Sequence, residues 1–224
     1  MIPYFSKRAA LLACAASALF LTGCAAPKPY DYTALRQAKP QSILVLPPLN
    51  QTPEVTAQAG VLSRVTLPLA ESGYYVLPVA VTEETFRQNG IITAQDAQDL
   101  PAAKLRDIFG ADAALYLNVS EYGSVYAVLR SETKVTLAAK LVDLRTGEQL
   151  WSGEASASSA ETKGTSSSLV GMLVSALIDQ IADSLSDRSV QIAEIANSRL
   201  LYAGRPGGLL HGPRSPQYGA SSQP

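Results

Sequence analysis

The alternation of apolar and polar residues first predicts a strand–helix–strand unit. Ser42–Pro48 is a short apolar run closed by two prolines, as expected of a strand that is buried on both faces. Apolar residues then recur at helical spacing through 54–73, where Pro68 should kink the helix and Gly73 should end it. Tyr74–Ala80 is a second apolar run. Because a helix separates the two runs, we expect their strands to pair in parallel.

The next stretch predicts further helices. Thr82 is followed by carboxylates, which suits a helix N-terminus, because a hydroxyl can cap the first turn and negative charge favours its positive end. Residues 93–110 carry another helical pattern, with a break expected near Pro101 and an end at Gly110.

In the middle of the chain the apolar period changes to two, which is typical of strands. The sequence ADAALYLNVSEYG, at 111–123, enters a strand, and alternate apolar residues of the following strand share one face. These residues are Val135, Leu137, Ala139 and Leu141. RTGEQLWSGEAS then returns the chain, and Gly147 can adopt the positive φ that a hairpin requires. The middle third therefore predicts an antiparallel meander with one face covered.

The last part of the chain divides into a helix and a tail. Ser167–Leu185 has a wide apolar face and predicts a helix that continues to Leu201, with a break near Ser186–Ser189. Residues 204–224 are rich in glycine and proline, so we expect a mobile or draped tail there rather than a helix. The whole pattern predicts an α/β fold: a single domain at 42–203 whose mixed parallel and antiparallel sheet has helices packed on it.

The first residues predict a secretory signal peptide at 1–23. Lys7 and Arg8 precede an uncharged apolar run of 14 residues, Ala9–Thr22, which is shorter than the roughly 20 that a membrane span needs. The sequence then reads LTGC, which resembles the bacterial lipobox, so Cys24 is predicted to carry a lipid and to become the first residue of the mature chain. The competing interpretation, a buried cysteine in a hydrophobic N-terminal helix, explains neither the basic segment nor the spacing.

Processing at this position changes the cysteine and charge counts. Cys14 leaves with the signal peptide and Cys24 carries lipid, so we expect no disulfide and no cysteine metal site. Loss of Lys7 and Arg8 leaves 16 basic residues against 19 acidic ones, with no basic stripe, which argues against a nucleic-acid partner. Residues 24–41 hold three prolines and predict a lipidated N-terminus and a tether, with the alternative that the later half packs along the domain.

Few residues have the pattern of a catalytic or ligand-binding site. His211 is the only histidine and lies in the tail, whereas a catalytic triad or a zinc site needs partners held by rigid elements. Asp179 and Asp183 lie four apart, but a solvated helix face explains them better than a cation site. Trp151 could mark a binding surface, although beside a hairpin such a residue is more often core. We therefore expect no catalytic residue, no cofactor, no metal and no enzymatic activity.

Three stretches resemble the bacterial lipoproteins of domain-of-unknown-function family 799, which includes a neisserial surface-antigen candidate. They are LPLAESGYYVLPVAV, LVDLRTGEQLWSG and RLLYAGRPGGLLHGPRSPQYG. Two looser stretches, GADAALYLNV and RTGEQLW, resemble the N-terminal domain of the Tol-system protein TolB and the curli-secretion lipoprotein CsgG. The resemblance implies an α/β fold, an outer-membrane lipoprotein, and a cell-envelope assembly or transport complex with CsgG-like lipoproteins as partners. It supplies no catalytic residues.

These observations predict an outer-membrane lipoprotein anchored through Cys24, with its domain facing the periplasm as a non-enzymatic component of such a complex. Ala25 follows the cysteine at the position where an aspartate would act as an inner-membrane retention signal, which favours outer-membrane sorting. The alternative is a stand-alone periplasmic lipoprotein that binds a solute or glycan. A hydrolase has little support, because the sequence shows no nucleophile–base pair.

Overall fold

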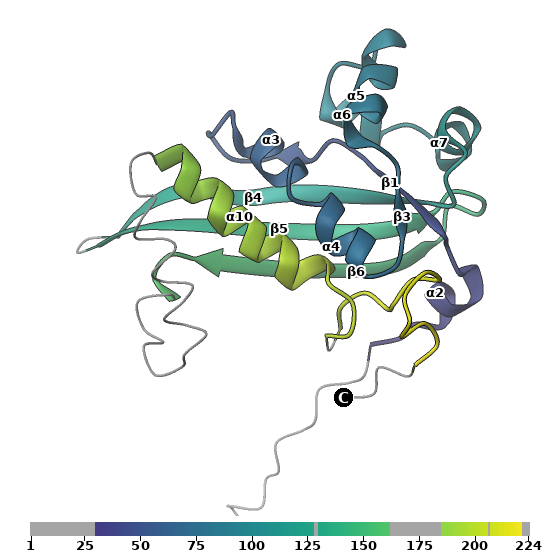
Figure 1. The fold of residues 1–224 in the computed structure, drawn as a ribbon. Helices are drawn as coiled ribbons and strands as arrows, with labels where there is room; N and C mark the ends of the chain where they lie inside the picture. Colours follow the sequence, from purple (N-terminus) through teal and green to yellow (C-terminus); the bar gives the residue numbers. More distant parts are fainter. Residues whose placement is uncertain (1–29, 128–129, 162–184, 206, 221–224) are drawn as a thin grey trace, which may run out of the picture. The chain divides into compact units, whose positions relative to one another are not determined.

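A mixed sheet organises the part of the chain that the structure describes. The computed structural model describes residues 30–127, 130–161, 185–205 and 207–220. Within these residues the sheet has six strands in the order β3-β1-β4-β5-β6, and β2 pairs with β4 beyond the end of β1 (Figure 1). The strands are β1 Ser42–Val45, β2 Leu49–Asn50, β3 Tyr75–Val76, β4 Ala113–Ala127, β5 Arg130–Asp143 and β6 Gln149–Ser158. Strand β1 is parallel to β3 and β4, whereas β4, β5 and β6 are antiparallel, so the predicted mixed sheet is confirmed.

Helices cover both faces of this sheet (Figure 1). They are α2 Thr33–Ala38, α3 Ala57–Leu62, α4 Thr66–Glu71, α5 Val79–Gln88, α6 Ala94–Gln98, α7 Ala102–Phe109 and α10 Leu185–Leu201. Helix α10 packs on β4, β5 and β6 and contacts α3 and α4. Helices α5, α6 and α7 supply Phe86, Ala97 and Leu105 to a separate cluster with Leu44 of β1, on the opposite face. The chain from Asp31 onward is thus one mixed α/β domain, as predicted.

The buried residues of β1 and β5 follow directly from this two-sided cover. Ile43 and Leu44 are both 0% exposed, because successive side chains of β1 point to opposite faces and each face carries helices. Leu137 and Leu141 of β5 share the α10 face and are also fully buried, which confirms the period-two prediction. The hairpin between β5 and β6 contains Gly147 at φ 76°, the positive φ that the sequence predicted.

The prediction of one continuous helix over 54–73 is wrong. The structure has two short helices, α3 and α4, and the break lies at 63–65 rather than at Pro68. In one continuous helix the Pro68 ring would meet the carbonyl four residues earlier, whereas near the start of α4 its missing N–H removes no helical hydrogen bond. The predicted end at Gly73 is confirmed, since Gly73 follows α4 with φ 94°.

The strand predicted at Tyr74–Ala80 is too long, and the helix cap predicted at Thr82 is misplaced. Only Tyr75–Val76 pairs with β1, in the parallel sense that was predicted. Pro78 then takes φ −57° and becomes the N-cap of α5, so Thr82 lies inside the helix and is buried. By contrast, α6 and α7 are separated next to Pro101 and α7 ends at Gly110 in the left-handed conformation, as predicted.

The two ends of the folded chain also differ from the sequence prediction. Thr33–Ala38, in the later half of the predicted tether, forms α2 and buries Leu35, which is the packed alternative. Helix α10 runs through Ser186–Ser189 without the expected break. Most of the helix predicted at Ser167–Leu185 lies outside the described residues.

Candidate functional site at the C-terminal segment

The residues after α10 form a folded strap, here called the C-terminal segment (residues 207–220). Three side chains of the domain donate hydrogen bonds to its backbone carbonyls: Tyr32 Oη to Gly208 (2.6 Å), Trp151 Nε1 to Gly207 (2.9 Å) and Tyr74 Oη to Leu210 (2.8 Å). Leu209 is buried at 1% exposure. Of the two forms expected for the tail, mobile or draped, the described part is therefore draped on its own domain.

Main-chain pairing holds the segment against the turn that follows α4. The Gly212 N–H donates to the Ser72 carbonyl at 2.8 Å, and the Arg214 N–H donates to the Gly73 carbonyl at 3.0 Å. The approach is so close that a Cβ on Gly212 would lie 2.6 Å from the Gly73 oxygen. Glycine is therefore required at this crossing for steric reasons.

Tyr74 joins the turn, β3 and the segment. Its side chain is 4% exposed, and burial, followed by the nearby Tyr218, raises its pKa well above the ordinary range. The hydroxyl therefore stays protonated at physiological pH and can act as a permanent donor to the Leu210 carbonyl.

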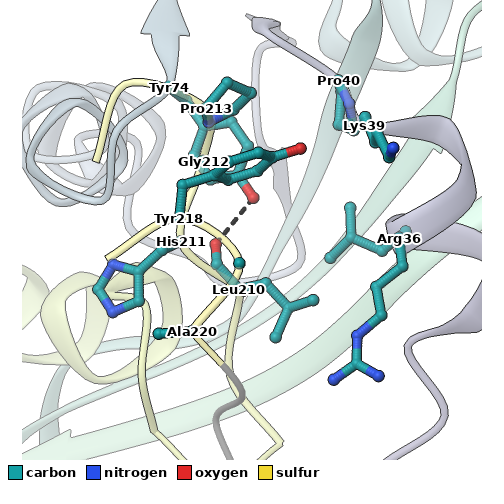
Figure 2. A pocket seen from close by; sticks show the side chains of 12 residues that line it. Arg36, Lys39, Pro40, Tyr74, Leu210, His211, Gly212, Pro213, Tyr218 and Ala220 are labelled. Carbon is teal, nitrogen blue, oxygen red and sulfur yellow. Dashed lines mark hydrogen bonds between the residues drawn. The ribbon is translucent and has the colours of Figure 1, made fainter. Parts of the chain in front are cut away.

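A pocket of about 470 Å³ lies between α2 and the C-terminal segment (Figure 2). Its apolar walls include Leu35, Pro40, Tyr74, Leu210 and Pro213. Its polar lining comes from two sides: Arg36 and Lys39 from α2 and its C-cap, and His211 and Tyr218 from the segment (Figure 2). Neither the α2 side chains nor the segment alone would enclose this space.

Among the described residues, neither Arg36 nor Lys39 forms an ion pair with a carboxylate, and two carboxylates near the end of α2 in sequence or through hydrogen bonds have other partners. Asp143 pairs with Arg145 at 2.7 Å, and that hydrogen bond lowers the Asp143 pKa. Burial alone would raise the pKa of Asp112, but hydrogen bonds from Gln41 and Ser42 lower it overall. Both carboxylates are thus ionised and already bound to other groups.

The geometry of the pocket suits binding more than catalysis. His211 Nδ1 lies 3.2 Å from Ser215 Oγ, and among the described residues no carboxylate hydrogen bonds to the imidazole, so the pair lacks the third member of a triad. Over the same described ranges, no three histidine, cysteine, aspartate or glutamate side chains gather to hold a metal.

The residues singled out from the sequence have different outcomes. Trp151 is 1% exposed, so its core interpretation is confirmed, although its indole also holds the C-terminal segment. His211 lines the pocket and is not part of a triad. Cys24, Asp179 and Asp183 lie outside the described residues, and lipidation at Cys24 stays a prediction. The sequence pattern did not identify Arg36 and Lys39 as pocket residues. The opposite wall of the pocket is the docked C-terminal segment, which lies far away in the sequence.

Together the sheet with helices on both faces and the strap define a mixed α/β domain with a pocket at its C-terminal segment. The chain belongs to the family described as "Putative lipoprotein GNA1162-like", whose sequence model matches residues 30–214. That family description names a lipoprotein, which indicates a membrane-anchored location in the cell envelope. It names no enzymatic activity.

Individual relatives agree with this assignment. The lipoprotein NMB1124/NMB1162 of Neisseria meningitidis serogroup B is 47% identical over 201 residues, which cover 89% of this chain and 93% of the relative. The crystal structure of lipoprotein GNA1162 from Neisseria meningitidis matches with 51% identity and a TM-score of 0.52, over 65% of this chain and all of that one. A more distant structural match, which adds nothing to the family assignment, is the PelC dodecamer from Paraburkholderia phytofirmans, with 16% identity and a TM-score of 0.42 over 71% of this chain and 86% of its own.

These matches bear out the predicted resemblance to a neisserial lipoprotein, whereas the family number 799 and the likeness to TolB and CsgG stay predictions. Within the described ranges, every helix is too short or too polar to cross a bilayer.

Proposed function

We propose that the protein is an outer-membrane lipoprotein, anchored through Cys24, whose domain is a non-enzymatic component of a cell-envelope assembly or transport complex with CsgG-like lipoproteins. The lipobox at Leu21–Cys24 supports the anchor, and Ala25 supports the outer membrane over the inner one. Membership of a lipoprotein family supports the envelope location. The proposal places the domain on the periplasmic side, a choice that the sorting argument does not determine.

The observation that carries the non-enzymatic role is the construction of the site. The pocket wall on one side is a glycine- and proline-rich strap, held by carbonyls that accept from Tyr32, Tyr74 and Trp151. Such a strap presents backbone and side chains to a partner or ligand in a fixed form, as recognition surfaces do. A catalytic site would instead require an activated nucleophile beside a base.

A crosslinking pull-down from intact cells tests the complex. A membrane-permeable crosslinker is added before mild detergent extraction, and the tagged full chain is purified with whatever it holds. We expect other envelope lipoproteins to be enriched, CsgG-like ones among them. The control is Cys24→Ala, which loses the lipidation site, should keep its signal peptide because it is not processed, and should lose these partners. Recovery of the wild-type chain alone after crosslinking would contradict the proposal.

The pocket favours a second candidate function, a stand-alone lipoprotein that binds a solute or glycan. Its volume of about 470 Å³ lies within the range of small-molecule sites. The same purification separates the candidates, because a solute-binding protein would be recovered without partner proteins and with a retained small molecule. Mass spectrometry of the extract would identify that molecule.

A further inference from the structure

The pocket beside α2 combines apolar walls with unpaired positive charge at its rim. Arg36 and Lys39 both line it and both are exposed. Within the described residues neither side chain forms an ion pair, whereas five other cationic side chains do. Other described cations, Lys104 and Arg106 of α7 among them, also form no ion pair, so Arg36 and Lys39 are distinguished by their place at a cavity.

The end of α2 keeps these cations free. The carbonyls at a helix C-terminus normally attract basic side chains of the last turn. Here Arg145 donates from Nη2 to the Ala38 carbonyl at 2.9 Å and occupies that position. Lys39 adopts φ 46°, and its N–H bonds to the Leu35 carbonyl, which ends the helix at the pocket. Arg36 and Lys39, three residues apart, thus present their charges without an internal acceptor.

We propose that this pocket binds the phosphate group of an amphiphilic ligand. The Arg36 guanidinium offers a bidentate fork, Lys39 offers a point charge, and Tyr218 carries a hydroxyl on the opposite wall. Figure 2 shows the two cationic groups pointing to different ends of the α2 side, so binding of one phosphate by both requires these exposed side chains to turn toward it. A tetrahedral phosphate can accept from donors on both walls, while the apolar part of the ligand lies against Leu210 and Pro213. A neutral sugar would leave both cations unpaired.

Two sources supply this chemistry: the headgroup of a membrane phospholipid and a soluble phosphate ester. The lipid source rests on the proposed anchoring, because the anchor would hold the pocket beside a membrane. Phosphate binding itself does not rest on the anchor. The experiment therefore needs one probe for each source and a neutral amphiphile.

Native mass spectrometry of the full chain, extracted in a non-ionic detergent, measures binding directly. The probes are dihexanoyl phosphatidic acid, glycerol 3-phosphate and neutral dihexanoyl glycerol. We expect phosphatidic acid to bind and dihexanoyl glycerol not to bind. The double variant Arg36→Gln/Lys39→Gln should weaken binding by at least about tenfold, because each lost charge-assisted hydrogen bond weakens the complex. Equal binding of glycerol 3-phosphate would assign the pocket to a soluble phosphate ester and retain the phosphate chemistry.

The matched control removes the same charges elsewhere. Lys104→Gln/Arg106→Gln on α7 also deletes one exposed lysine and one exposed arginine, away from the pocket, and should bind like the wild type. Equal loss in both double variants, undiminished binding in Arg36→Gln/Lys39→Gln, or equal binding of the neutral probe would overturn the proposal. The assay uses no partner and no membrane, so its outcome is independent of the pull-down.

Discussion

At the residue scale, two features of Gly73 require glycine at this position. Its φ is 94°, and a Cβ there would lie 2.4 Å from the Ser215 nitrogen. We expect Gly73→Ala to lower the free energy of unfolding by about 2–4 kcal/mol, from backbone strain and overpacking together. Gly90→Ala is the matched control, because Gly90 has φ 77° with nothing within 4 Å, and should cost only about 1–2 kcal/mol. Urea unfolding of both variants measures the difference; equal losses would show that the Ser215 contact is not tight.

Tyr74 gives a second prediction, which concerns one hydrogen bond. Tyr74→Phe leaves the Leu210 carbonyl without its donor at a partly buried position, so we expect a loss of about 1 kcal/mol in unfolding free energy. Tyr75→Phe is the control, because Tyr75 is 44% exposed and keeps its ring beneath Arg214 in the variant. That change should stay within about 0.5 kcal/mol by denaturant titration. If Tyr74→Phe leaves the unfolding free energy unchanged, water has replaced the tyrosine hydroxyl as donor.

Asp143 gives the pH dependence. Its hydrogen bond with Arg145 lowers its folded-state pKa below the unfolded value of about 4. Its contribution is therefore complete at neutral pH and disappears as pH falls through the lowered folded-state pKa. We expect Asp143→Asn to cost about 1 kcal/mol at pH 7, since Arg145 is partly solvated, and progressively less as the pH falls below about 4, measured as unfolding free energy across the acid range. A cost that stays the same across this range would contradict an ionic origin.

At the element scale, strand and helix types were predictable wherever one strong local signal existed. The period of two in β5 and the glycine ends of α4 and α7 fall in this group. The errors lie at two prolines. At Pro68 the ring excludes the carbonyl four residues earlier from a continuous helix, and at Pro78 the fixed φ starts a helix directly after a strand. The pocket could not be predicted at all, since it exists only where α2 meets residues far away in sequence.

The docked C-terminal segment gives the element-scale prediction. A mobile tail would leave the stability of the domain unchanged when Arg205–Pro224 is deleted. The structure predicts a direct loss of stability, because the deletion exposes the site of Leu209 and removes the acceptors of Tyr74 and Trp151. We expect at least about 3 kcal/mol, from one buried leucine and the broken hydrogen bonds. Thermal melting measures this, and an unchanged melting temperature would contradict it.

At the scale of the whole molecule, the prediction concerns the anchor. Because one acyl chain binds membranes only marginally, stable attachment takes the several chains that a lipobox cysteine receives. We expect Cys24→Ala to remain uncleaved before residue 24 and to lose lipid labelling, and the wild type to sediment with outer-membrane density. Metabolic labelling with a fatty acid and density-gradient fractionation measure both. Cleavage at residue 24 with salt-resistant membrane attachment in the variant would refute the anchor, and inner-membrane density would refute the sorting.

The hydrogen bond from Tyr32 to Gly208 joins residues 176 positions apart. Closing so long a loop costs chain entropy, and the contact cannot form until Gly208 has been made. If the chain is exported residue by residue, α2 leaves the exporter before the C-terminal segment does. The hydrogen bond between them can form only after both are outside. A chain that is interrupted before Gly208 lacks the acceptor of Tyr32, so α2 is held less firmly. Such a truncated chain should be cleaved by envelope proteases faster than the intact one.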